Sequence, residues 1–169
     1  DAISINNKFS FNVAGIGYDA LISKYFANQK KRGLIKYLLL SIFSLNAYKP
    51  KEYSVHINNM KIKIKPFTIA ICNGKQYGNN FQICPEAKID DGKINICLIK
   101  HSSFFNLMKL AWEFYLGKIH YSKLYNSYKS EALTINSKNN ILIHLDGESV
   151  VLDKKIKIKV ITKSINFVC

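Results

Sequence analysis

Apolar and polar residues alternate along much of this chain, and this alternation predicts β-strands. In Lys61–Lys65 and Lys155–Val160, lysine alternates with isoleucine or valine. Runs of this kind form strands with one face in a core and the other face in solvent. Phe67–Cys72 is almost wholly apolar, as is typical of a central strand. Further strands are predicted over residues 4–14 (one long strand or a pair), 53–57, 81–84, 93–100, 132–135, 141–145, 156–161 and 165–168.

Three segments carry apolar residues at helical spacing, and we expect helices over residues 18–28, 34–47 and 104–116. Ser102 or Ser103 is placed to cap the third of these helices. Its apolar side chains, Phe105 and Trp112 among them, are predicted to lie in the core, and a groove that admits an acyl chain is the alternative. Residues 121–128 are predicted to form a short helical or irregular piece.

The order of these elements predicts the fold class. Strands follow one another with few helices between them, and turn signals such as Asn58-Asn59 join them as hairpins. This favours a β-rich α+β fold, an antiparallel β-sandwich with a few edge helices, over a doubly wound parallel sheet. Gly15-Ile16-Gly17 leads from a strand to a helix but lacks the third glycine of a dinucleotide-binding loop. We expect residues 1–169 to form a single domain.

Composition and charge narrow the choice of partners. The chain is 48% apolar and 12% aromatic, which is typical of a globular domain with a real core. Its formal charge of +14 suggests an anionic partner: nucleic acid, a lipid headgroup surface or a phosphorylated substrate. The alternative is that the lysines form the solvent face of the alternating strands, where they also prevent edge-to-edge pairing. The sequence leaves both interpretations open.

The four cysteines, at positions 72, 84, 97 and 169, have no zinc-ligand spacing. Cys72, Cys84 and Cys97 fall in apolar runs, so we expect reduced core residues and a reducing cytoplasm. No apolar run reaches the roughly 18 residues that a membrane span needs. The chain lacks an initiator methionine and a signal peptide, and a strand pattern begins almost at once, which predicts a piece of a longer protein.

Two acidic turns, Asp90-Asp91-Gly92 and Asp146-Gly147-Glu148, are the most informative candidates for a functional site. Each lies beside an apolar alternating run, so both predict tight hairpin turns. The chain has only 11 acidic residues, and their concentration at two turns suggests a site for a cation or for proton transfer. Gly147 is expected to supply the positive φ that its turn requires.

Each candidate residue has a functional and a structural interpretation. Glu148 is a candidate general base, or else a solvated turn carboxylate. Asp146 either orients its turn by accepting hydrogen bonds from backbone amides or helps to hold a metal. Asp91 is a candidate Mg²⁺ ligand, or part of a hairpin without an ion, and Asp90 is expected to face solvent. His144 is expected to face outward from its strand, and no histidine is assigned a catalytic role.

Four segments in order resemble a known family. They are Phe11–Ala20 (FNVAGIGYDA), Asn73-Gly74 with Gly78 after an apolar strand, Pro85–Lys93 (PEAKIDDGK), and Leu145–Glu148 (LDGE). Together they resemble the C-terminal domain of the bacterial diacylglycerol kinase and lipid kinase family, which is related to the sphingosine kinases. The resemblance covers nearly the whole chain. The family's N-terminal domain carries a Gly-Gly-Asp-Gly-Thr motif that binds ATP, and this chain has no such motif.

The resemblance implies roles for particular residues. Glu148 corresponds to the general base that takes the proton of the lipid hydroxyl. The implied Mg²⁺ site uses Asp91 and the main-chain carbonyl groups of Lys88 and Lys93. Asn12, Asp19 and Asn73 could line the interdomain cleft near ATP, with Gly74 beside them, or they could be caps and turn formers.

We therefore expect the C-terminal, substrate-side domain of an ATP-dependent kinase that phosphorylates a hydroxyl of diacylglycerol or a related lipid. Its cofactors would be Mg²⁺ and ATP, the latter bound mainly by the N-terminal domain, and the isolated domain would be inactive. Its partners would be a lipid at the inner membrane face, its own N-terminal domain and, in a homodimer, a second copy. The alternatives are a basic β-domain that binds nucleic acid and part of a soluble-nucleotide kinase of the NAD type.

Overall fold

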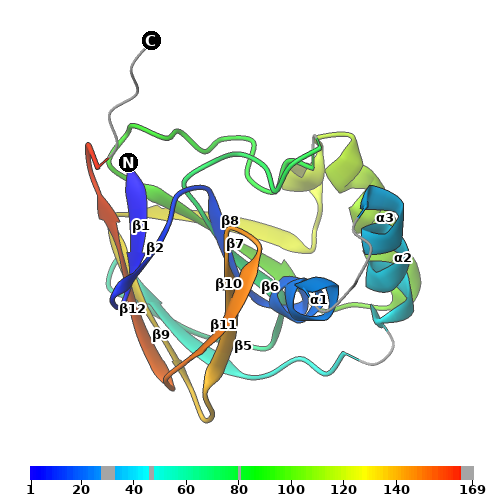
Figure 1. The fold of residues 1–169 in the computed structure, drawn as a ribbon, viewed down its shortest axis with the longest axis horizontal. Helices are drawn as coiled ribbons and strands as arrows, with labels where there is room; N and C mark the ends of the chain where they lie inside the picture. Colours follow the sequence, from blue (N-terminus) through cyan, green and yellow to red (C-terminus); the bar gives the residue numbers. More distant parts are fainter. Residues whose placement is uncertain (28–32, 46–47, 80, 165–169) are drawn as a thin grey trace.

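Two six-stranded antiparallel sheets, packed face to face, form the body of the molecule (Figure 1). The computed structural model describes residues 1–27, 33–45, 48–79 and 81–164, with residues 34–38 described by their backbone alone. The first sheet, sheet A, has the order β2 (Lys8–Ser10), β1 (Ala2–Ile5), β12 (Lys155–Ile161), β9 (Ala132–Ser137), β4 (Tyr53–Ile57) and β5 (Met60–Ile64). The second, sheet B, has the order β11 (Glu148–Leu152), β10 (Ile141–Leu145), β3 (Val13–Gly17), β6 (Pro66–Cys72), β7 (Ile94–Lys100) and β8 (Tyr125–Ser130). The prediction of an antiparallel β-sandwich with edge helices is confirmed.

Alternate side chains of the two sheets fill the core between them. Ile3 and Ile5 from β1 face this core, as do Ile69 and Ile71 from β6. The lysines of β12 lie on the opposite, exposed face of sheet A. The alternation of lysine and isoleucine therefore describes a half-buried strand, as predicted.

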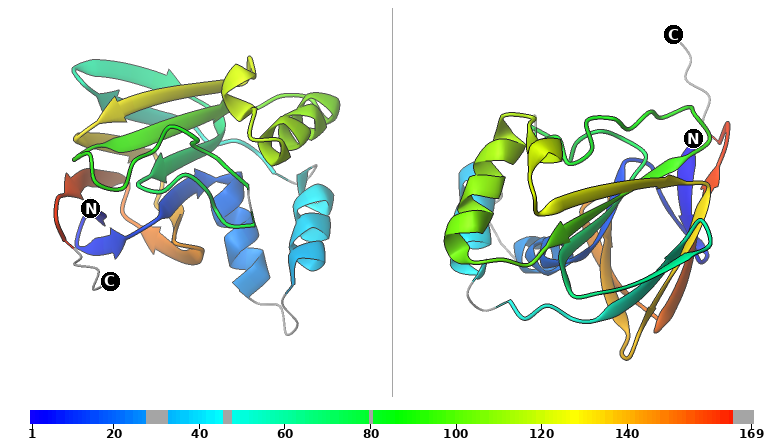
Figure 2. Two further views of the ribbon diagram at one scale, coloured as in Figure 1. Left: turned by 90° about the horizontal axis from the view of Figure 1, so that it is seen from above. Right: turned by 180° about the vertical axis from the view of Figure 1, so that it is seen from behind.

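Helices cover part of the outer face of sheet B, so its central strands β3, β6 and β7 are buried on both sides. Helix α3 (Phe104–Tyr115) contributes Leu107 and Leu110 to a second apolar cluster, which also contains Ala70, Cys72 and Cys97 from β6 and β7. Helix α1 (Tyr18–Ala27) packs on β3, β10 and β11 at the other edge. Figure 2 shows α2 (Leu34–Phe43) and α3 at the same end of the molecule. Among the described residues, no helix is long and apolar enough to cross a membrane.

Several boundaries and elements differ from the sequence predictions. Residues 81–84 lie in an irregular loop and form no strand. Within the predicted irregular piece at 121–128, a 3₁₀ turn (Ile119–Tyr121) ends and the edge strand β8 begins. Strand β11 was not predicted, although it forms the second arm of the Asp-Gly-Glu hairpin. The strand predicted at 165–168 lies outside the described residues.

Two further predictions were wrong because of tertiary packing. Asp90-Asp91-Gly92 is a turn, but it connects an irregular loop to β7, so it does not close a hairpin. On α3, Phe105 is 82% exposed and Trp112 is 63% exposed, so neither side chain is in the core. Ser103 occupies the N-cap position, as expected, although its hydroxyl makes no capping hydrogen bond.

Candidate functional site

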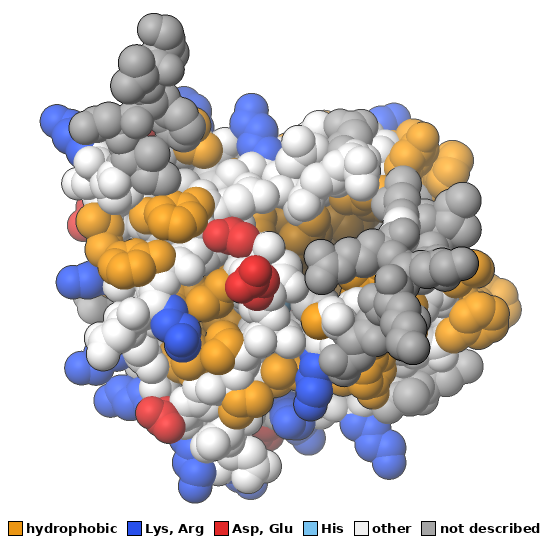
Figure 3. Space-filling model, viewed as in Figure 1, with side chains coloured by type: hydrophobic (Ala, Val, Ile, Leu, Met, Phe, Trp, Pro, Cys, Tyr) orange, Lys and Arg blue, Asp and Glu red, His pale blue; other side chains and the backbone are white. Residues whose placement is uncertain are grey.

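The Asp146-Gly147-Glu148 turn joins β10 to β11 in a tight two-residue hairpin. Asp146 has a φ of +50° and Gly147 a φ of +92°, the pair of positive values that defines a type I′ turn. Leu145 pairs with Glu148 across the turn, and the Glu148 side chain is exposed. The tip of the hairpin lies near the centre of the face drawn in Figure 1, and the same view in Figure 3 shows acidic side chains gathered there. Between them and the helical end, Figure 3 shows a recess with hydrophobic side chains on its floor.

Asp146 fixes this turn to the preceding part of the chain. Its Oδ1 accepts hydrogen bonds from the Ser10 hydroxyl at 2.8 Å, the Asn12 N–H at 2.9 Å and the Val13 N–H at 3.0 Å. Its Oδ2 accepts one from the Phe11 N–H at 2.7 Å. Of the two roles that the sequence left open for Asp146, the contacts favour orientation of the turn through backbone amides.

A buried polar network supports the turn from below. The Gly147 N–H donates to His144 Nδ1 at 3.3 Å, and His144 Nε2 lies 3.3 Å from Asp19 Oδ2. The same Asp19 oxygen accepts a hydrogen bond from the Tyr77 hydroxyl at 2.7 Å. Because Nδ1 is the acceptor of the Gly147 N–H, the imidazole proton is on Nε2, from which it is donated to Asp19. The network therefore connects the first turn of α1 to the peptide that precedes Glu148.

His144, which was predicted to face outward from its strand, is only 2% exposed. The alternation along β10 places it on the outer face of sheet B as expected, but α1 covers that face. Gly15 makes room for the pair, since a Cβ there would overlap the Asp19 carboxylate and lie 2.5 Å from His144 Nε2. The roles of His144 and Tyr77 were not predicted from the sequence. Both residues contact Asp19, and an aspartate in the first turn of a helix was the one sequence signal that could have pointed to this site.

Asn12, Asn73 and Gly74, the candidate nucleotide-binding residues, lie together beside the Asp146 contacts. The N–H groups of Asn73 and Gly74 both donate to the Asn12 carbonyl oxygen, at 2.9 and 3.0 Å. Asn73 Nδ2 donates to the carbonyl oxygens of Phe11 and Asp1, and the Asn12 side chain donates to that of Gln76. A Cβ on Gly74 would overlap Asn12 Oδ1. These contacts are those of turn formers, while a role in nucleotide binding stays a prediction.

Asp1 connects this cluster to the second acidic turn. Its carbonyl oxygen accepts the Asn73 hydrogen bond, and its carboxylate accepts the Gly92 N–H at 2.8 Å. Its amino group donates to the Ile89 carbonyl oxygen. The two acidic turns, 54 residues apart from Gly92 to Asp146 in the sequence, are therefore joined by hydrogen bonds through Phe11, Asn73 and Asp1.

Asp91 is engaged in an ion pair. Its Oδ2 lies 2.5 Å from Lys129 Nζ, and its Oδ1 accepts the Lys93 N–H at 3.1 Å. Desolvation raises the pKa of the Asp91 carboxyl, but the hydrogen bonds from Lys129 and Lys93 and the charges of Lys129 and Lys88 outweigh it, so the pKa lies below its ordinary value. A carboxylate beside main-chain carbonyl groups suits Mg²⁺. A divalent cation at Asp91 would have to displace the Lys129 ammonium, whose side chain is 41% exposed.

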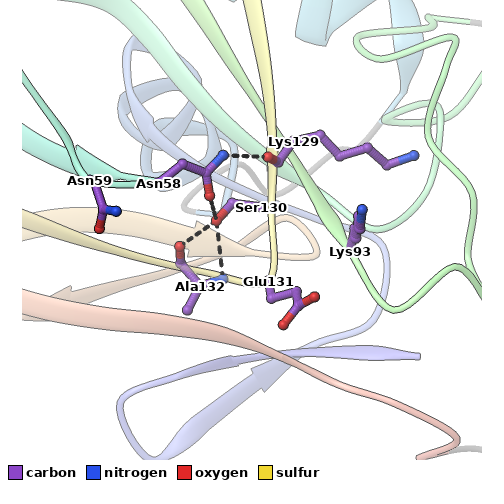
Figure 4. Close-up of a pocket in the computed structure, with 7 residues that line it drawn as sticks. All are labelled: Asn58, Asn59, Lys93, Lys129, Ser130, Glu131 and Ala132. Atoms are coloured by element: carbon purple, nitrogen blue, oxygen red, sulfur yellow. Dashed lines mark hydrogen bonds between the residues drawn. The ribbon is translucent and has the colours of Figure 1, made fainter.

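A pocket of about 440 Å³ lies beside this ion pair (Figure 4). Its lining includes Lys93, Lys129 and Glu131. The Asn58 side chain donates to the Lys129 carbonyl oxygen and accepts from the Ser130 hydroxyl, which fixes the end of β8, where Lys129 lies. Glu148 is not among the residues that line this pocket.

The three described cysteines confirm the prediction of free core thiols. Cys72, Cys84 and Cys97 are unpaired and buried beneath α3. Cys97 Sγ lies 2.9 Å from the Tyr125 hydroxyl. Burial raises the pKa of the Cys72 thiol well above its ordinary value, so it stays protonated.

The β-sandwich fold agrees with a comparison against known protein families. The YegS C-terminal NAD kinase beta sandwich-like domain matches residues 12–165, and the chain belongs to this family. A probable YegS-like lipid kinase of Shewanella frigidimarina is 29% identical over 170 residues, which cover 99% of this chain and 54% of that protein. A probable YegS-like lipid kinase of Pectobacterium atrosepticum is 25% identical over 98% of this chain and 55% of its own length. The predicted resemblance is confirmed, and the chain spans about half the length of these relatives.

Solved structures show the same fold. A putative diacylglycerol kinase from Bacillus anthracis superposes with a TM-score of 0.68 at 20% identity, over 95% of this chain and 53% of that one. Another structure of a putative diacylglycerol kinase from this organism gives a TM-score of 0.67 at 15% identity, over 95% and 52%. The similarity to a C-terminal domain of a lipid kinase is thus supported by sequence and by fold.

Proposed function

We propose that this chain is the substrate-side half of an ATP-dependent lipid kinase that phosphorylates a hydroxyl of diacylglycerol or a related lipid. The observation that carries the proposal is an exposed carboxylate, Glu148, held on a turn that Asp146 and His144 fix from two sides. The names of the relatives, which are probable lipid kinases and putative diacylglycerol kinases, support the substrate class.

In this proposal Glu148 is the general base. A lipid hydroxyl is a weak nucleophile until its proton is removed, and a fixed carboxylate within hydrogen-bond reach can accept that proton. The hydroxyl oxygen then forms a bond to the γ-phosphorus of ATP while the bond from the γ-phosphorus to the bridging oxygen of ADP breaks. Asp146 and His144 hold the turn, so Glu148 does not need to reorganise as the proton moves.

Asp91 would hold Mg²⁺ together with the carbonyl groups of Lys88 and Lys93, and the ion would neutralise charge on the phosphoryl group. ATP itself would be bound mainly by an N-terminal domain, which corresponds to the half of the relatives that this chain does not match. On its own the 169-residue chain is expected to be inactive.

The general-base role of Glu148 is tested in the full-length protein, which would include the ATP-binding domain. Glu148→Gln is expected to lower kcat for diacylglycerol phosphorylation by about 10²–10⁴-fold, the usual contribution of a general base, with little change in KM for ATP. Glu52→Gln, another exposed glutamate, is the matched control and should leave kcat unchanged. Wild-type turnover in the Glu148 variant would refute the assignment.

The metal proposal has its own test. If Asp91 binds Mg²⁺, Lys129→Met removes the competing ammonium and should strengthen Mg²⁺ binding, measured by calorimetry. Asp91→Asn should abolish that binding. If Mg²⁺ affinity is the same in wild type and in both variants, the ion binds elsewhere.

A further inference from the structure

Helix α3 has two apolar faces, and the core uses only one of them. At 100° per residue, Leu107 and Leu110 point to one side, where they are buried against sheet B. On the opposite side the helix presents a second stripe, about 120° wide by the same geometry. Its members are Phe104, Phe105, Met108, Trp112, Tyr115 and Leu116. All of them except the partly buried Met108 are exposed.

The surroundings of this stripe are basic. Lys109, Lys118 and Lys123 lie on α3 or shortly after it, and Glu113 is the only acidic residue within residues 104–123. Lys109 lies at the edge of the stripe with 76% of its side chain exposed, and Lys118 and Lys123 follow the helix on exposed positions. The pair between Lys109 and Glu113, at 3.8 Å, is an exposed i,i+4 contact that leaves Lys109 available.

We infer that the outer stripe of α3 is a contact surface for an anionic phospholipid bilayer, with the helix lying in the plane of the interface. Tryptophan and tyrosine favour this boundary because each has an apolar body and a polar edge. Lysines beside an aromatic stripe add attraction to anionic headgroups, and a surface of this composition is typical of interfacial helices. The proposal extends the proposed function, on which the choice of a lipid partner rests in part.

Helix α3 is also connected to the candidate site, but through its inner side. Phe114, on the inner side of α3, lies with its ring centroid 6.1 Å from that of Tyr77 in an edge-to-face contact. Tyr77 in turn donates to Asp19, the partner of His144 beneath the Asp-Gly-Glu turn. The helix that carries the outer stripe is therefore connected by side-chain contacts to the elements that hold Glu148.

The chain carries its own probe for this contact, because Trp112 is its only tryptophan. We expect mixed phosphatidylcholine and phosphatidylglycerol vesicles to move the Trp112 emission to shorter wavelength and to protect it from acrylamide. Pure phosphatidylcholine vesicles should do this much less, and added salt should weaken the effect. Phe105→Ser should weaken vesicle binding by about tenfold, the factor for losing one buried aromatic side chain.

The matched control is Phe9→Ser, which changes an aromatic residue of similar character, 53% exposed, on the edge strand β2 of the other sheet. It should bind vesicles as the wild type does. Emission that is unchanged by anionic vesicles at low salt, or equal binding by the Phe105 variant, would overturn the inference. The inference would also be overturned if the stripe proved to be a dimer interface. In that case Phe105→Ser would abolish a dimer seen by light scattering, and neither the wild type nor the variant would bind vesicles. Binding is measured without nucleotide, and its persistence in Glu148→Gln separates this surface from the kinase assignment.

Discussion

Replacing Asp146 by alanine removes the acceptor of four hydrogen bonds, and the cost follows from which donors are buried. Phe11 and Asn12 are exposed, so water can replace the carboxylate at their N–H groups. Ser10 and Val13 are buried, so their donors lose a partner without an equivalent replacement. Each such donor costs about 1–2 kcal/mol, and alanine in the left-handed conformation adds about 1 kcal/mol. We expect the free energy of unfolding to fall by about 3–5 kcal/mol.

Urea unfolding, followed by circular dichroism, measures this loss. With a denaturant slope of about 2 kcal/mol per molar, the Asp146→Ala midpoint should fall by about 2 M. Asp146→Asn keeps one carbonyl oxygen and tolerates a positive φ, so it should cost only about 1–2 kcal/mol. Asp153→Asn, in the exposed connection from β11 to β12, is the control and should stay within about 0.5 kcal/mol. A midpoint shift below about 0.3 M for the alanine variant would refute the view that this carboxylate holds the turn.

Three further predictions concern other parts of the structure. Gly15→Ala should lower the free energy of unfolding by about 1–3 kcal/mol, measured by urea unfolding, because its Cβ would overlap the Asp19 carboxylate. Lys129→Met should be less stable than wild type at neutral pH. That deficit should shrink as the pH falls below about 4, because a carboxyl with a lowered pKa stabilises the fold above its unfolded pKa and loses this contribution as it is protonated. An equal deficit at all pH values would contradict the ion pair with Asp91. In a Cys169→Ser background, the three buried thiols should react with a thiol reagent only after unfolding, and fast labelling of the native chain would contradict their burial.

Periodicity predicted the sandwich because the sheets bury alternate side chains. The isoleucines of β1 and β12 face the core between the sheets, and the lysines of β12 face solvent. Predictions from periodicity were wrong where tertiary packing decided which side chains are buried. Phe81 packs on Phe114 and Tyr115 of α3, so an apolar segment was mistaken for a strand. The outer stripe of α3 was assigned to the core because helical spacing identifies an apolar face without saying what lies against it.

The candidate site was predicted in part for a similar reason. Turn chemistry identified the hairpin at Asp146 and Gly147 and predicted the positive φ of Gly147, which the structure confirms. The sequence did not indicate the role of His144. Alternation with a period of two shows only on which side of β10 the residue lies. The helix that covers that side, α1, is more than a hundred residues away in the sequence.

The sequence by itself determined the class of fold, the family and the two acidic turns, because alternation, turn residues and short ordered motifs are local properties. Only the tertiary structure decided that these turns are joined through Asn73 and Asp1, that Asp146 binds the backbone of residues 11–13, and that His144 is buried against Asp19. The physical reason is that a hydrogen bond between distant residues depends on how the sheets and α1 pack. No spacing along the chain encodes that packing directly.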